Sequence, residues 1–201
     1  MIETYENILQ IAVLAGCILV TVIRSVERKS SLWTILTLFY GSWMLGDIYW
    51  LACLAFYGMT PQISVVSDLS WYASYIFLYM LLRRASPPDL TSGTKGLPLA
   101  GSIFALGMGL FFMHWGEILS NLIYAGLFGL LLYAAITRLQ ERRAVCLSVG
   151  ILVFCFLEYG LWLSSCFWKS DTAANPYYWF DLLLTACLPF FLFATHKAVK
   201  E

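Results

Sequence analysis

Charged residues are scarce in this chain of 201 residues, at 12%, whereas soluble globular proteins have about 25%. Hydrophobic residues make up 61%, and the mean hydropathy is +0.77. These values exclude an ordinary soluble domain, and they predict that lipid solvates most of the chain. The formal net charge is zero, and the basic residues follow a topological pattern, so we expect no nucleic-acid partner.

Histidine is also rare, and the two that are present, His114 and His196, are expected near opposite ends of the bundle. A three-histidine zinc centre is therefore excluded. The segment 176–195 contains no lysine, which excludes a retinal Schiff base, and no phosphate-binding loop, HExxH or GxSxG motif occurs. We predict no metal site, no cofactor and no catalytic residue.

Six cysteines are present without CxxC spacing, so we interpret them as packing residues. A disulfide at the outer surface involving Cys53 or Cys166 stays open.

Long apolar runs account for nearly the whole chain. A helix needs roughly 20 residues to cross the hydrocarbon core. We predict a single all-α transmembrane domain over residues 1–201, with seven spans over residues 7–23, 32–57, 62–82, 96–113, 117–137, 144–167 and 176–195. The acidic start of the chain does not resemble a cleavable signal peptide, so we expect the first span to be retained.

Basic residues alternate between the connections. Eleven of the twelve Lys and Arg lie in the segments 24–31, 83–95 and 138–143 or after His196, and the remaining one is Lys169. The positive-inside bias therefore places the N-terminus outside and the C-terminus in the cytoplasm, which requires an odd number of spans. We expect a bacterial inner-membrane location.

An internal repeat is suggested by the motif R-x-x-E-R-[KR], which begins at Arg24 and again at Arg138. Each copy precedes a span with a carboxylate and a Trp, an outer loop with a proline, and an acid in the next span. This order favours a parallel 3+1+3 duplication around a central fourth span. Gly101, Ala105 and Gly109 give that span a face of small residues, which allows close helix packing.

Acidic and aromatic side chains collect in the expected outer half of the bundle. Asp47 and Glu158 lie past the middle of outward-running spans, and Asp68 and Asp181 lie near the start of inward-running spans. A charge facing lipid is costly, about 2.5–3.5 kcal/mol on insertion scales, so such groups usually face a bundle interior or a water-filled cavity. The plainer alternatives are carboxyls that only lock helix packing, acids that cap helices and an ordinary interfacial aromatic belt.

Helical spacing places these residues on shared faces. Trp43, Asp47 and Trp50 share one face, Glu158 and Trp162 another, and the third span aligns Asp68 with its aromatics. The predicted site is an outward-facing cleft formed by Trp43, Asp47, Trp50, Asp68, Trp71, Tyr72, Tyr75, Glu158, Trp162, Tyr177 and Asp181. Acids among aromatic faces suit an amine or quaternary ammonium ligand, and they also suit a sugar-like ligand that stacks and hydrogen-bonds.

The segments "GDIYWL" and "TPQISVVSDLSW" resemble small seven-span bacterial membrane proteins of unassigned function. They also resemble, more loosely, the multi-pass sensory regions that precede GGDEF domains. That resemblance implies a sensor for a small molecule, which would need a separate signalling or transport partner because no output domain follows "THKAVKE". The "GD" at 46–47 is similar to lysoplasmalogenase-type membrane hydrolases, but their early Lys-Pro is missing. The 3+1+3 plan is similar to that of SWEET-type sugar transporters, although Pro61-Gln62 falls in a loop.

We therefore expect a lipid-embedded sensor or transporter that binds a small cationic or sugar-like molecule. The alternatives are a carboxylate-dependent lipid hydrolase, which needs two neighbouring carboxyls, and a structural subunit of a membrane complex, which should have no cavity.

Overall fold

The computed structural model describes residues 2–59, 65–87 and 96–200. All regular secondary structure in these residues is helical, as the sequence predicts. The helices are α1 (Ile2–Arg28), α2 (Ser31–Tyr57), α3 (Val65–Ala85), α4 (Gly96–Phe112), α5 (Ile118–Gln140), α6 (Val145–Phe167), α7 (Pro176–Cys187) and α8 (Phe190–Lys200). The Pro61-Gln62 motif lies outside the described residues.

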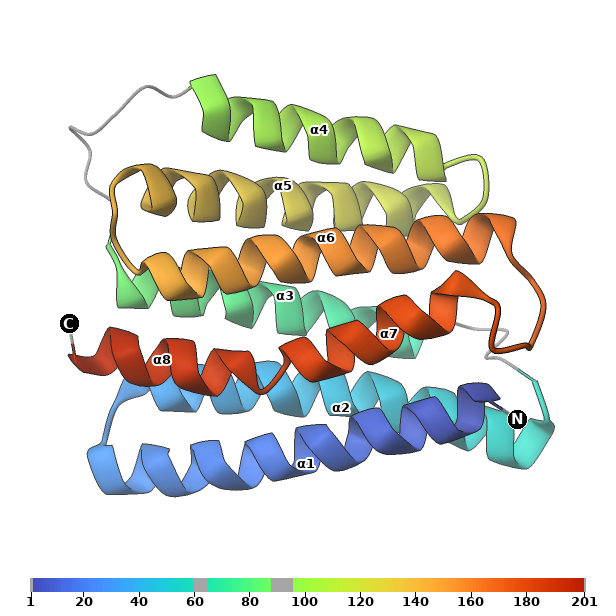
Figure 1. Ribbon diagram of the computed structural model, residues 1–201, viewed down its shortest axis with the longest axis horizontal. Coiled ribbons are helices and arrows are strands. Elements are labelled where there is room, and N and C mark those ends of the chain that lie inside the picture. Colours follow the sequence, from blue (N-terminus) through green and yellow to red (C-terminus); the bar gives the residue numbers. More distant parts are fainter. Residues whose placement is uncertain (1, 60–64, 88–95, 201) are drawn as a thin grey trace.

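The helices run roughly parallel to one long axis, and successive rods alternate in direction (Figure 1). The chain starts at one end of the bundle and finishes at the other, as an odd number of passages requires (Figure 1). We call these the N-terminal end and the C-terminal end.

Six of the rods form a closed ring. Neighbours in the ring are α1 and α2, α2 and α3, α3 and α5, α5 and α6, and α6 and α7, and α7 returns to α1. The fourth helix lies outside the ring and packs chiefly on α5 (Figure 1). The two groups α1–α2–α3 and α5–α6–α7 thus meet at two junctions, but common ancestry of the two groups stays a prediction.

The small-residue face of α4 forms its contact with α5. A Cβ on Gly109 would collide with Ala125, and a Cβ on Gly101 would lie 2.7 Å from Ile136 Cδ1. Ser102 also donates a hydrogen bond to the Gly129 carbonyl oxygen at 3.0 Å. The predicted packing role of this face is confirmed.

The last predicted span, 176–195, is not one continuous helix. It is interrupted at Leu188 and Pro189, and α8 then continues to Lys200. Proline has no backbone N–H and its ring crowds the preceding turn, so it breaks the ladder of helical hydrogen bonds. The Tyr40 hydroxyl donates to the Leu188 carbonyl oxygen at 2.7 Å, so this carbonyl at the break has a side-chain partner.

The outer surface of the bundle is strongly apolar. Five segments are long and apolar enough to cross a membrane: α1, α3, α5, α6 and the combined α7 and α8 (Pro176–Val199). The fourth helix is apolar but has only 17 residues. The second has 27 residues, but it is not among the five because Asp47 and its Trp and Tyr residues lower its hydropathy. Large side chains such as Leu19, Leu110 and Phe156 are more than 60% exposed. Soluble monomers rarely expose apolar surface on this scale, so the fold has the character of a multi-pass membrane protein.

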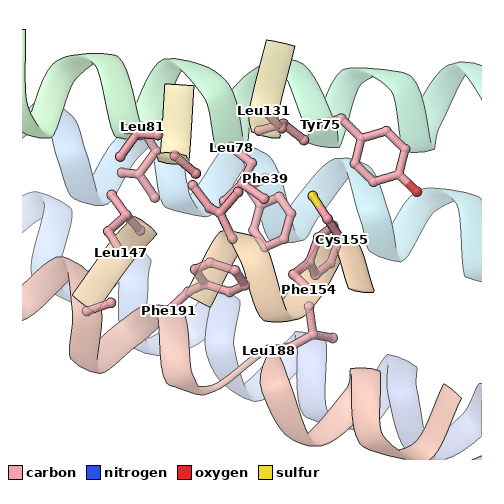
Figure 2. Close-up of a cluster of buried hydrophobic side chains, with 14 of the residues drawn as sticks. Phe39, Tyr75, Leu78, Leu81, Leu131, Leu147, Phe154, Cys155, Leu188 and Phe191 are labelled. Atoms are coloured by element: carbon pink, nitrogen blue, oxygen red, sulfur yellow. The ribbon is translucent and has the colours of Figure 1, made fainter. Parts of the chain in front are cut away.

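The core fills the middle of the ring with aromatic and aliphatic side chains. Phe39 from α2, Phe154 from α6 and Phe191 from α8 pack edge to face with centroid distances of 5.6–6.1 Å. Tyr75 stands at the edge of this cluster, and its hydroxyl points away from the other labelled side chains (Figure 2). The core therefore closes the centre of the bundle.

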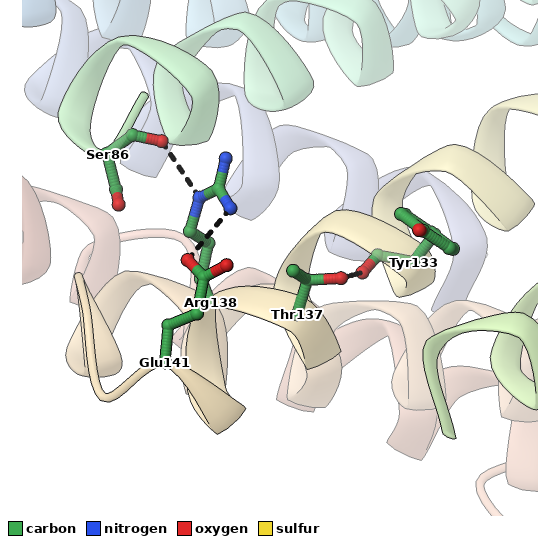
Figure 3. A network of polar contacts seen from close by, with 5 residues as sticks. All are labelled: Ser86, Tyr133, Thr137, Arg138 and Glu141. Atoms are coloured by element: carbon green, nitrogen blue, oxygen red, sulfur yellow. Dashed lines mark hydrogen bonds and ion pairs between the residues drawn. The ribbon is translucent and has the colours of Figure 1, made fainter. Parts of the chain in front are cut away.

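The two copies of the R-x-x-E motif have different environments. Arg138 is buried, donates to the Ser86 carbonyl oxygen at 2.8 Å and pairs with Glu141 at 3.0 Å (Figure 3). Arg24 and Glu27 pair at 3.4 Å, but their side chains are 44% and 55% exposed. In the second copy the arginine itself joins α5 to the residue that follows α3, whereas the first copy contacts α2 through Ser25, whose hydroxyl pairs with that of Thr34 at 2.7 Å.

Candidate functional site

A cavity of about 580 Å³ opens among the helices at the N-terminal end of the bundle. Ligand-binding cavities usually have volumes of about 300–1,000 Å³. Five ring helices and the α6–α7 connection contribute most of the lining, with one further residue from α5. Eight of the eleven predicted site residues line it: Trp43, Trp50, Trp71, Tyr75, Glu158, Trp162, Tyr177 and Asp181.

Glu158 is the acid of α6 in this cavity, and its side chain is almost entirely buried, with 3% exposed. The Tyr75 hydroxyl lies beside its carboxyl group and interacts with it. No lysine or arginine forms an ion pair with Glu158 among the residues that the structure describes. A carboxylate without a basic partner in a largely apolar interior has a large desolvation cost. A cationic ligand would offset that cost.

Asp181 is the acid of α7 in the same cavity and joins α7 to α1. The Gln10 amide donates to Asp181 at 3.2 Å and to the Thr185 hydroxyl at 3.0 Å. Asn175 caps the start of α7, since its side chain accepts a hydrogen bond from the Tyr177 backbone N–H at 3.0 Å. These contacts fix the position of the Asp181 carboxyl at the cavity wall.

Asp47 does not line the cavity; it lies behind Trp71. Its side chain is 2% exposed, and Trp71 Nε1 donates to one carboxyl oxygen at 3.3 Å. The other oxygen is buried and has no hydrogen-bond partner in the described part of the chain. Gly46 makes this arrangement possible, because a Cβ there would lie 2.6 Å from Trp71 Nε1. Gly46 and Asp47 thus hold the indole of Trp71 in position, and Trp71 is the residue that lines the cavity.

Asp68 faces a different space, and Tyr72 lines neither of the two spaces. Asp68 lines a neighbouring recess of about 480 Å³, where it accepts hydrogen bonds from Ser120 at 3.3 Å and Tyr124 at 3.5 Å. Tyr72 pairs with Ser120 at 2.6 Å and does not line the cavity. The predicted stripe on the third span is therefore split, because Trp71 turns toward α2 whereas Asp68 and Tyr72 turn toward α5.

The two spaces share a wall that is mostly aromatic. The residues common to both are Trp50, Trp71, Tyr124, Trp162, Ser165 and Lys169. Trp50 and Trp71 pack at 5.8 Å between centroids, and Tyr124 and Trp162 pack at 4.7 Å. Ring faces of this kind attract cations through their quadrupoles.

Charged side chains surround the mouth of the cavity. Glu3 accepts a hydrogen bond from Trp50 Nε1 at 2.9 Å, and Asp171 accepts one from the Tyr178 hydroxyl at 2.8 Å. Lys169 donates to the Ser165 carbonyl oxygen at 2.5 Å and is the cavity's basic lining residue. Its ammonium group makes no ion pair within the described residues.

Several lining residues were missed from the sequence. Glu3, Asn7 and Gln10 are spaced i, i+4 and i+7, which places them on one face of α1, and all three line the cavity. This polar face is visible in the sequence, but Glu3 precedes the first predicted span, and Asn7 and Gln10 are neither acidic nor aromatic. Tyr124 and Lys169 were also missed as site residues.

No protein family, characterised protein or solved structure matches the chain. The described residues contain no group of three or more His, Cys, Asp or Glu that could hold a metal ion. All six cysteines are free, so the disulfide that was left open for Cys53 or Cys166 does not form.

Proposed function

We propose that this protein binds a small ammonium-bearing molecule in the cavity at the N-terminal end, and that it acts as a sensor or transporter in a bacterial inner membrane. The observation that carries the proposal is the position of Glu158 and Asp181. These two buried carboxyl groups lie at the wall of an aromatic cavity, with no lysine or arginine bonded to either in the described residues.

The basic residues support an outward-facing cavity. Lys169 lies at the cavity mouth, and the other Lys and Arg of the described helices lie toward the C-terminal end. By the positive-inside bias, this distribution supports an extracytoplasmic cavity in a protein with the seven proposed spans. A ligand would enter from the periplasm, and the aromatic core of Phe39, Phe154 and Phe191 closes the path toward the cytoplasm.

The cavity also bears on the alternatives. A structural subunit has no need for a cavity with buried acids. A lipid hydrolase of the kind outlined above would use Asp47 against its substrate, but Asp47 is 2% exposed and lies behind Trp71. A sugar-like ligand would use the same aromatic faces without needing the charge of Glu158.

The test is equilibrium binding to the purified full-length protein, followed through tryptophan fluorescence, since several tryptophans line the cavity. We expect choline or a primary amine to bind saturably, and we expect Glu158→Gln to weaken binding at least tenfold. Glu27→Gln, which changes an exposed acid at the C-terminal end, should bind like the unmodified protein.

Two results would contradict the proposal. One is glucose binding that survives in Glu158→Gln while the amines do not bind, which would favour a sugar-like ligand. The other is equal amine binding by all three proteins, which would place any binding outside the cavity. If the amines bind as expected, their uptake by proteoliposomes would separate a transporter from a sensor.

A further inference from the structure

The cavity has acidic side chains in its deep wall and a basic side chain at its mouth. Its deep wall contains the carboxyl groups of Glu158 and Asp181, and its mouth contains the ammonium group of Lys169. The acids and the base do not neutralise one another, because no ion pair joins them in the described chain. A ligand that satisfied both ends would carry a positive charge at one end and a negative charge at the other.

The separation of the two ends can be worked out from α6. Lys169 Nζ lies 2.5 Å from the carbonyl oxygen of Ser165, which follows Glu158 by seven residues on the same helix. At 1.5 Å per residue, the backbone positions of Glu158 and Ser165 are about 10 Å apart along the axis, and Lys169 Nζ lies beside the second of them. A short zwitterion such as an α-amino acid cannot reach both ends.

The mouth contains acids as well, but these already have donors. Glu3 accepts from Trp50 and Asp171 accepts from Tyr178. The ammonium group of Lys169 has three N–H donors and uses one of them, on a backbone carbonyl oxygen. Its other two N–H donors have no acceptor among the described residues, so they can serve an anionic group of a ligand.

We infer that the ligand is an elongated zwitterion, whose ammonium group lies against Glu158 and Asp181 and whose carboxylate or phosphate lies against Lys169. This inference rests on the proposed function and narrows its ligand class. The aromatic wall shared by the two spaces would cover the apolar linker between the charged groups of the ligand.

The experiment compares two probes of similar length, 6-aminohexanoate and 1,6-diaminohexane. Their linkers are alike, and they differ in the charge of the end expected at the mouth. We expect the unmodified protein to prefer 6-aminohexanoate. Lys169→Glu should shift the ratio of the two affinities toward the diamine by about tenfold or more, since one charge reversal weakens one contact and creates another. A phosphate-ended probe of the same length would show which anion is preferred.

Lys197→Glu is the matched control. Lys197 is also an exposed lysine, but it lies at the C-terminal end and contacts Cys146 at 3.4 Å. It should leave the affinity ratio unchanged.

Different results would contradict the zwitterion inference and the proposed function. If both probes bind through Glu158 but Lys169→Glu leaves their ratio unchanged, or if the unmodified protein prefers the diamine, the zwitterion inference is wrong and the cavity remains a cation site. If neither probe binds in a way that depends on Glu158, the proposed function fails first.

Discussion

The contact between Trp71 and Asp47 gives the most specific prediction about stability. Replacing Trp71 by Phe keeps an aromatic ring but removes the N–H donor of Asp47. That carboxyl is 2% exposed, and its second oxygen already has no partner in the described residues. The variant would leave a buried acid without a hydrogen bond.

The expected cost follows from the geometry. Removing one partner of a buried polar group costs about 1–3 kcal/mol. The distance of 3.3 Å is longer than the usual 2.7–3.2 Å, so we expect the lower part of this range, about 1–2 kcal/mol. For a chain of about 200 residues, each kcal/mol lowers the unfolding temperature by about 2–4 °C.

A double-mutant cycle with Asp47→Leu isolates the contact. A leucine side chain has no acceptor, so in the Asp47→Leu background Trp71→Phe should cost only the packing of the lost ring atoms. The coupling free energy should therefore be about 1–2 kcal/mol. The double variant replaces both partners by apolar groups, so its hydrogen-bond cost should be smaller than that of Trp71→Phe alone. Gly46→Ala should imitate Trp71→Phe, because the added Cβ occupies the position of the indole edge. Thermal unfolding of the detergent-purified protein measures all of these.

The reasoning is refuted if Trp71→Phe has the same effect in the Asp47→Leu background as in the unmodified protein. That result would mean that Asp47 is satisfied by something other than Trp71.

Two further pairs of variants test the packing. Arg138→Met should lower the free energy of unfolding by about 3–5 kcal/mol, because it leaves the buried Glu141 without its partner. Arg24 is exposed, so Arg24→Met should lower it by less than about 1 kcal/mol. Equal losses in denaturant unfolding would contradict the difference in burial. Gly109→Ala should destabilise the contact of α4 with α5, whereas Gly107→Ala, which meets nothing within 4 Å, should be stabilising by about 0.5–1 kcal/mol through helix propensity. If the two alanine variants have the same unfolding temperature, close packing does not explain the small-residue face.

Apolar length predicted the helices well because a span must satisfy its backbone hydrogen bonds internally, and an α-helix does so with local contacts alone. The face with Trp43 and Trp50 was predicted for the same reason, since helical spacing is local. What could not be predicted was which neighbour each side chain would meet. Trp71 turns toward α2 because Gly46 leaves room for it, and this depends on a residue in another helix.

The repeat motif shows the same limit. Arg24 and Arg138 begin the same R-x-x-E-R-[KR] motif, but among the described residues Arg138 bonds to the end of another helix, at Ser86, whereas Arg24 pairs with Glu27 of its own helix. The motif alone could not show which of the two arginines contacts another helix. By contrast, the break at Pro189 could have been predicted from the proline itself. The polar face of Glu3, Asn7 and Gln10 could have been predicted from their spacing.

The central claim is that water-soluble cations reach the buried acids from the N-terminal end. The most direct measurement is the labelling rate of single cysteines by a membrane-impermeant thiosulfonate that carries a trimethylammonium group. The cysteines are introduced in a chain whose six natural cysteines are replaced by alanine. Leu161→Cys lines the cavity, and Leu163→Cys on the same helix is exposed on the outer surface of the bundle. The account predicts that Leu161→Cys reacts many times faster than Leu163→Cys when the reagent is added outside, and that Glu158→Gln slows this reaction. Equal rates at the two positions, or a rate at Leu161→Cys that does not depend on Glu158, would contradict it.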